Sequence, residues 1–175
     1  RRPVTESIAP ARVSVEHLCD LNFLLAEFFA DTAIEAMRLI GQKVPARCLV
    51  LIETTVPPGT TEFVAYPIMK KIFTRRGIQS EPLLAHSYER VMPGRNYVAS
   101  IRDFWRVCSG INPAARDRVV RFLSEVLNVR KFPLTVLDRP IESETAKIVE
   151  NSYRATILAF LDEWSLFGER NGADL

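Results

Sequence analysis

The chain has 175 residues, of which 47% are hydrophobic and 25% are charged, enough apolar content for one ordinary folded domain. Its 23 basic and 21 acidic residues are well mixed, so the sequence offers no electrostatic footprint for nucleic acid or for an anionic membrane. No segment reaches the apolar length of a membrane span. Cys19, Cys48 and Cys108 are far apart, which excludes the common zinc spacings. Cys48 and Cys108 lie in apolar runs and are predicted to be buried free thiols, which favours a reducing, cytoplasmic setting.

The first half of the chain predicts alternating helices and strands. Apolar residues at helical spacing predict a helix over 15–41 and another over 60–76, each followed or ended by a glycine. The continuous apolar run at 47–54 is typical of a buried parallel strand, and 82–86 predicts a second short strand.

The second half continues the alternation. We predict a strand over 104–109, a helix over 113–127 and a strand over 134–137. Strands that alternate with helices indicate an α/β fold with a mostly parallel, Rossmann-like sheet and flanking helices. Ligands of such sheets bind outside the carboxyl ends of the strands, where this chain has the polar loops 54–61 and 87–96.

A long helix is predicted over 143–163, a stretch without proline or glycine. Four polar residues fall on one narrow stripe of this helix: Glu144, Lys147, Asn151 and Arg154. Apolar residues cover most of the rest, which indicates a buried helix whose polar stripe lies in a site or a polar cleft. The alternative is a solvated face with weak ion pairs such as Glu150–Arg154.

The loop after the first strand reads ETTVPPGTT. Two prolines fix this loop, and Gly59 lets the backbone approach a ligand. Thr60 or Thr61 can cap the next helix, whose N-terminal N–H groups suit an anionic ligand. Thr55 can offer its hydroxyl to the cleft. The alternative is a rigid turn with a helix cap.

The loop after the second strand contains HSYERVMPG. If Glu89 faces a buried Lys147, the two groups tune each other's pKa, and the carboxylate can act as a general base through a water. The alternative is an exposed Glu–Arg pair in a loop. His86 is interpreted as a hydrogen-bonded residue at a strand end, because no second His or Cys accompanies it, and no metal site is predicted.

Three segments in this order, ETTVPPGTT, YERVMPG and ESETAKIVENSYRA, resemble the nucleotide-sugar 6-dehydrogenases, the UDP-glucose/GDP-mannose dehydrogenase family. Those enzymes oxidise the C6 hydroxyl of a nucleotide sugar such as a UDP-sugar to a carboxylate with two NAD. The resemblance covers 49–175. It implies a partial NAD-binding Rossmann-like domain over 1–140, without its first βα unit, and a central helix over 141–175 that begins the middle domain and mediates homodimerisation in the intact protein.

The resemblance also assigns roles to individual residues. Thr55 would order the catalytic water and touch the cofactor, and Glu89, also near the cofactor, would be the general base for thioester hydrolysis. Lys147 would stabilise the oxyanion, and Asn151 would hold the substrate and the same oxyanion, an arrangement that agrees with the chemistry of an oxyanion hole. The sugar site would be lined by Arg90, Val91, Met92 and Arg154.

The chain also departs from the family pattern. Tyr88 stands where the family has a proline, the seven glycines include no G-x-G motif, and none of the three cysteines lies in the family's glycine-rich catalytic context. We therefore expect a fragment that does not catalyse the reaction alone. The form of the second motif is more like members that act on UDP-N-acetylhexosamines than members that act on UDP-glucose.

Two other functions stay open at this point. A β-hydroxyacid dehydrogenase also places a Lys and an Asn four residues apart on its central helix, although the two proline-glycine loops argue against it. A non-catalytic, helix-mediated dimerisation module is the third possibility. Binding of a UDP-sugar, of a short hydroxy acid or of neither distinguishes the three.

Overall fold

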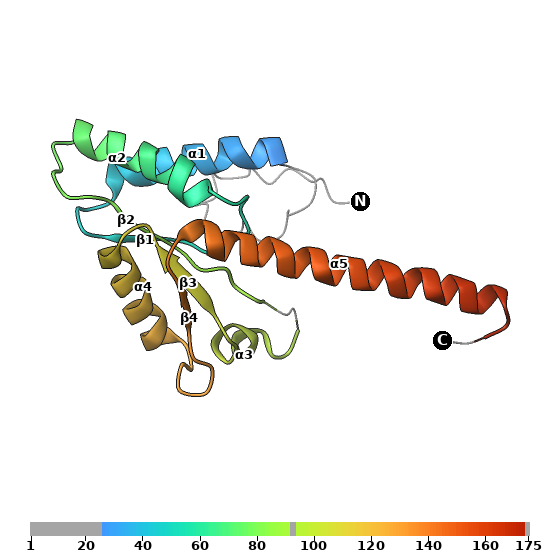
Figure 1. The fold of residues 1–175 in the computed structure, drawn as a ribbon. Coiled ribbons are helices and arrows are strands. Elements are labelled where there is room, and N and C mark those ends of the chain that lie inside the picture. Colours follow the sequence, from blue (N-terminus) through green and yellow to red (C-terminus); the bar gives the residue numbers. More distant parts are fainter. Residues whose placement is uncertain (1–25, 92–93, 174–175) are drawn as a thin grey trace, which may run out of the picture.

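The computed structural model describes residues 26–91 and 94–173, which form a sheet with helices on both faces (Figure 1). The four strands are β1 (Leu49–Ile52), β2 (Leu83–His86), β3 (Val107–Gly110) and β4 (Thr135–Leu137), in the order β1-β2-β3-β4. The pairs β1/β2 and β3/β4 are parallel, and β2/β3 is antiparallel. The predicted α/β fold with a mostly parallel sheet is confirmed.

One short helix was not predicted. The chain passes from β2 to the antiparallel β3 through α3 (Tyr97–Arg102). Because β1 and β2 run parallel, their carboxyl ends share one edge of the sheet with the amino end of β3. The two polar loops singled out in the sequence both begin at this edge.

Helices cover the two faces of the sheet because successive strand residues point to opposite sides. One face packs against α1 (Ala26–Lys43) and α2 (Tyr66–Arg75), and α4 (Pro113–Val126) covers the other. The first core contains Val50, Ile52, Met69, Phe73 and Leu84, and the second contains Ala85, Cys108, Val119 and Leu123.

The helix predicted over 60–76 is present in two parts. It begins as the π-helical turn η2 (Thr60–Ala65) and continues as α2. The helix predicted over 15–41 is present as α1, although 15–25 lie outside the described residues. The prediction for Cys48 was wrong, because this residue precedes β1 and is exposed. Cys108 is a buried free thiol as predicted, and burial raises its pKa to about 11.

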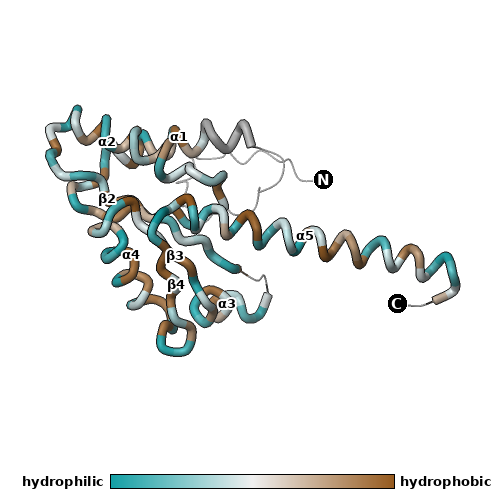
Figure 2. The backbone as a smooth tube through the Cα atoms, in the orientation of Figure 1, coloured by the Kyte–Doolittle hydropathy of each residue, from teal (hydrophilic) through white to brown (hydrophobic). Residues whose placement is uncertain are grey.

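The long helix α5 (Pro140–Arg170) is present, but the prediction that it is buried was wrong. Figure 1 shows its first turns against the sheet and its remainder projecting away from it, so no described element covers the projecting part. Its apolar side chains are consequently exposed, among them Val149 at 61%, Tyr153 at 69% and Phe160 at 57%. Polar and apolar segments alternate along this projecting part in Figure 2. No helix within 26–91 or 94–173 combines the length and apolar character of a bilayer-spanning segment.

Glu144 joins α5 to the loop that follows β1. Its side chain is fully buried, and its two carboxylate oxygens accept hydrogen bonds from Gly59 N (2.5 Å), Thr61 N (2.8 Å) and Thr61 Oγ1 (2.6 Å). Gly59 has a left-handed backbone (φ 91°), which a glycine adopts without strain. The N-terminal N–H groups that the sequence assigned to an anionic ligand are therefore engaged by a carboxylate of the chain itself.

A second buried contact holds the same turn of α5 against the sheet. Ser143 Oγ lies 2.7 Å from His86 Nδ1 and 2.7 Å from Ser109 Oγ, and all three side chains are fully buried. His86 Nε2 lies 3.4 Å from the carbonyl oxygen of Thr54. His86 is thus a hydrogen-bonded residue at the end of a strand, as predicted.

The Glu144 contact predicts a large effect of Glu144→Gln on stability. The substitution places an amide NH2 opposite a backbone N–H in a buried position, so we expect the free energy of unfolding to fall by about 2–4 kcal/mol. Urea unfolding followed by circular dichroism measures this. Glu163→Gln, on an exposed part of the same helix, is the matched control and should change stability little. Equal stabilities of the two variants would remove Glu144 from the docking contact.

The buried His86 predicts a pH dependence of stability. Burial lowers its pKa from 6.5 to about 4, so the unfolded chain binds a proton near pH 6.5 that the folded chain does not bind until about pH 4. Stability from this group is therefore lost as the pH falls from 6.5 to 4, by up to about 3 kcal/mol. His86→Asn should be less stable at pH 7 but have a shallower dependence over this range. If the stability of the two proteins changes with pH in the same way between pH 6.5 and 4, His86 is not the group responsible.

Candidate active site

The candidate site lies at the edge of the sheet where β1 and β2 end and where α5 passes. Segments far apart in the sequence meet there: the loop after β1, the loop after β2 and the first turns of α5. All three carry motifs singled out in the sequence.

Lys147 lies at the centre of this region and is half-buried. Its Nζ donates a hydrogen bond to the backbone carbonyl of Glu89 (3.2 Å) and lies 5.2 Å from the centroid of the Tyr88 ring. Burial lowers the pKa of Lys147, while the carboxylates of Glu150 and Glu89 act in the opposite direction. The site therefore holds an ammonium group that loses its proton more readily than an ordinary lysine.

Glu89 contacts Lys147 through its backbone carbonyl and not through its carboxylate. The Glu89 carboxylate accepts a hydrogen bond from Val91 N (2.5 Å) and is only partly buried. The Glu89 carboxylate therefore stabilises the turn of its own loop, while the Glu89 backbone carbonyl accepts the hydrogen bond from the Lys147 ammonium. The two residues are thus neighbours through the main chain of Glu89, and its carboxylate contributes to the electrostatic environment of the lysine.

Arg90 is fixed beside the same helix. Its Nε and Nη2 donate to one oxygen of Glu150 at 3.1 and 2.8 Å, and its guanidinium lies 4.9 Å from the Phe104 ring centroid. The other oxygen of Glu150 accepts from Arg154 Nη2 (3.3 Å), which is the ion pair named in the alternative interpretation of the polar stripe as a solvated face. Glu150 therefore bridges two of the arginines assigned to the sugar site.

The remaining predicted residues form no hydrogen bond with the Lys147 side chain within the described part of the chain. Thr55 follows β1 and is half-buried, and its hydroxyl forms no hydrogen bond with the described residues. Asn151 is exposed on α5, one helical turn after Lys147, and Val91 is half-buried. Met92 lies outside the described residues. The structure thus joins Glu89 to Lys147 by a hydrogen bond and holds Arg90 beside the same helix through Glu150.

A buried arginine, Arg106, pairs with the half-buried Glu53 and supports both loops, a contact that was not predicted from the sequence. Arg106 is 5% exposed, and it donates to Glu53 Oε1 (2.6 Å) and to the carbonyl of Tyr88 (3.0 Å). Arg106 stands just before β3, in a segment read as an apolar strand, and Glu53 opens the first motif. A charged residue inside an otherwise apolar run was the available signal, since a buried charge needs a partner.

An apolar cavity opens beside the loop after β1. It has a volume of about 300 Å³ and lies between α1 and this loop, with Ile34, Val56, Pro57 and Phe63 among its lining residues. Its apolar walls suit a flat ring or an aliphatic group better than a phosphate. Anionic parts of a ligand would have to lie elsewhere, because Glu144 already engages the nearby N–H groups.

Comparison with known proteins gives related sequences but no matching family model. The chain is 29% identical over 140 residues to UDP-N-acetyl-D-mannosamine dehydrogenase of Pyrococcus horikoshii, covering 80% of this chain and 32% of that protein. It is 30% identical over 145 residues to the enzyme of the same name from Escherichia coli, covering 80% of this chain and 33% of that protein. The chain thus spans about a third of the length of the curated relatives it matches.

A solved structure gives the same result. The NDP-N-acetyl-D-galactosaminuronic acid dehydrogenase of Methanosarcina mazei matches with a TM-score of 0.63 and 30% identity, over 78% of this chain and 28% of that chain. The resemblance that the three motifs predict is therefore confirmed, and the relatives of this chain are nucleotide-sugar dehydrogenases.

Proposed function

We propose that this chain is a segment of an NAD-dependent nucleotide-sugar 6-dehydrogenase that oxidises the C6 hydroxyl of a UDP-N-acetylhexosamine to a carboxylate. The observation that carries this proposal is the contact of Lys147 with the main chain of Glu89, which joins the second and third motifs in one polar site. The names of the relatives from Pyrococcus horikoshii and Escherichia coli support the choice of substrate.

Each residue has a role that follows from its chemistry. The Lys147 ammonium supplies a positive charge to an oxygen that gains negative charge during the reaction, and Asn151 supplies an amide donor from the next turn of α5. Glu89 accepts a proton through a water once its carboxylate turns from Val91 N, and the Thr55 hydroxyl orients that water. Arg90, Val91, Met92 and Arg154 line the sugar site, with Glu150 holding both arginines in place.

The residues present fit the nicotinamide ring of NAD but not its pyrophosphate. The apolar cavity beside Val56 and Pro57, next to Thr55, has the character that a nicotinamide ring requires. The helix N-terminus at Gly59 does not fit the pyrophosphate, because Glu144 occupies its donors. NAD supplies the hydride acceptor when bound, and Thr55 and Glu89 are the residues of this chain that we place beside it.

The same proposal divides the chain into two parts. Residues 1–140 belong to the cofactor domain, whose described part holds the sheet, and 141–175 form the central helix at the start of the middle domain. Such a division places Lys147 and Asn151 at the boundary between domains, a common location for a ligand site.

We also propose that α5 mediates homodimerisation. Its projecting part exposes a series of aromatic side chains, with Trp164 50% exposed and its ring centroid 5.5 Å from that of Phe167 and 6.1 Å from that of Phe160. Exposed apolar surface of this extent is typical of an interaction surface. Burial between two copies would give the helix the apolar surroundings that its sequence predicts.

Replacement of Lys147 tests the enzymatic proposal. In the full-length protein, Lys147→Ala should lower kcat by about 100- to 1000-fold, with little change in sugar binding, because the lost contact is strongest in the transition state. Because burial lowers the pKa of Lys147, the wild-type rate should fall as the pH rises through that pKa, and Lys147→Arg should move this decline to higher pH. The measurement is NADH formation with UDP-N-acetylhexosamines.

Two comparisons make this experiment decisive. Lys71→Ala removes an exposed lysine on α2 and should leave the rate unchanged. Turnover of a short hydroxy acid in place of a UDP-sugar would favour the β-hydroxyacid dehydrogenase alternative, and near-normal turnover of a folded Lys147→Ala protein would remove Lys147 from the mechanism.

Replacement of Trp164 tests the dimer. Trp164→Glu places a charge within the exposed aromatic series and should shift the 175-residue chain from dimer to monomer in analytical ultracentrifugation. Ser124→Glu introduces the same charge on an exposed position of α4 and should leave the dimer intact. A monomeric unmodified chain, or a Trp164→Glu protein that remains dimeric, would contradict this role of α5.

A further inference from the structure

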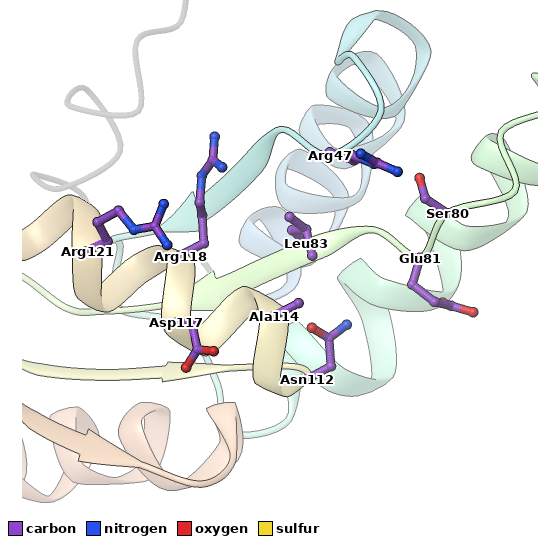
Figure 3. Close-up of a pocket in the computed structure, with 9 residues that line it drawn as sticks. All are labelled: Arg47, Ser80, Glu81, Leu83, Asn112, Ala114, Asp117, Arg118 and Arg121. Atoms are coloured by element: carbon purple, nitrogen blue, oxygen red, sulfur yellow. The ribbon is translucent and has the colours of Figure 1, made fainter.

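A cavity of about 500 Å³ opens at the opposite edge of the sheet from the candidate active site (Figure 3). It is lined by residues that precede β1 and β2 and by the first two turns of α4. Its volume lies in the range of small-molecule sites. The loops after β1 and β2 and the Lys147 side chain meet at the other edge, so the proposed dehydrogenase chemistry does not use this cavity.

Three arginines surround the cavity. Arg118 and Arg121 lie one turn apart on α4, and Arg47 lies on the other wall, where its side chain extends toward Ser80 (Figure 3). Within the described parts of the chain, none of the three forms an ion pair with a carboxylate. Their combined charge is therefore available to a ligand.

The two acidic residues of the lining do not neutralise these arginines. Glu81 pairs with Lys70 (3.0 Å) and accepts a hydrogen bond from the Tyr66 hydroxyl (2.5 Å). The Asp117 carboxylate points away from Arg118 and Arg121 (Figure 3). The charge that faces the cavity is consequently positive, which favours an anion.

Ser80 adds a polar group that lacks a partner. Its hydroxyl is buried and has no hydrogen-bond partner among the residues that the structure describes. Ser80 lies beside Arg47 at the cavity wall (Figure 3). Buried hydroxyls are normally hydrogen-bonded, so this one is an exception that a ligand oxygen would remove.

The backbone at Arg47 is also unusual. In 26–91 and 94–173, Arg47 is the one non-glycine residue with a left-handed conformation, at φ 64°. This conformation is unfavourable for a residue with a Cβ atom, and here it belongs to the turn 45–48, which a hydrogen bond from Cys48 N to the Pro45 carbonyl (3.3 Å) closes. The turn places the Arg47 side chain beside Ser80 (Figure 3).

We propose that this cavity binds a small molecule that carries phosphate groups. The guanidinium groups of Arg47, Arg118 and Arg121 supply charge and paired donors that match phosphate oxygens, and the Ser80 hydroxyl donates one further hydrogen bond. Leu83 and Ala114 form an apolar part of the lining that a nucleoside can contact. The site is separate from the proposed active site, and its test does not depend on dehydrogenase activity.

Titration calorimetry of the 175-residue chain with inorganic pyrophosphate tests the proposal. We expect saturable one-to-one binding that Arg118→Gln weakens by about tenfold, the effect of one charge-assisted contact. Ser80→Ala should weaken it by about two- to fivefold. Arg130→Gln removes the same charge from an exposed position outside the cavity and should leave binding unchanged. A parallel titration with uridine diphosphate shows whether a nucleoside adds affinity.

A second variant on the other wall of the cavity keeps the proposal testable if Arg118→Gln does not fold. Arg47→Asn changes the opposite wall and keeps a residue type that tolerates the left-handed conformation, so it should weaken binding as Arg118→Gln does. Circular dichroism confirms that each variant is folded. The proposal is overturned if pyrophosphate does not bind, or if Arg130→Gln weakens binding as much as the cavity variants do, since general surface charge would then account for it.

Discussion

The structure depends on one buried carboxylate. Glu144 reaches from α5 to the N–H groups of Gly59 and Thr61, where the chain turns from β1 into η2. Hydrogen bonds and the helix dipole stabilise a carboxylate at a helix N-terminus and offset part of the desolvation that burial imposes; burial still raises the pKa of Glu144 above its ordinary value. The Ser143–His86–Ser109 hydrogen bonds are a second buried contact at the same turn, and Ile141 N donates to Glu62 Oε1 (3.3 Å) nearby.

The position of Lys147 follows from that contact. Lys147 lies three residues after Glu144, so a helix docked through Glu144 presents Lys147 to the loop after β2. The lysine then lies between the Glu89 carbonyl and the Tyr88 ring, with Glu150 on the next turn holding Arg90. The structural carboxylate and the proposed catalytic ammonium are thus neighbours on one helix, and the first determines where the second acts.

The sequence predicted those parts of the fold that local pattern controls. Apolar runs located the strands, and glycines marked the end of helices such as α2. The sequence did not show which polar residue serves the fold and which serves the site, because Glu144 and Lys147 occupy the same stripe. It also could not predict the Arg106–Glu53 pair, which joins residues 53 positions apart. Finally, the apolar surface of α5 led to the wrong prediction of a buried helix, because most of α5 projects from the sheet and nothing within the described residues covers that part.

The most direct test of this account is the pKa of Lys147, measured by NMR titration of the chain with labelled lysine side chains and assigned with Lys147→Arg. Burial lowers this pKa below the ordinary value of 10.5. If Glu144 determines the position of Lys147, the pKa should lie below that of the exposed lysines in the unmodified chain and return toward theirs in Glu144→Gln, in which α5 is less firmly docked. A Lys147 that titrates with the exposed lysines in the unmodified chain, or that keeps its lowered pKa in Glu144→Gln, would contradict the account.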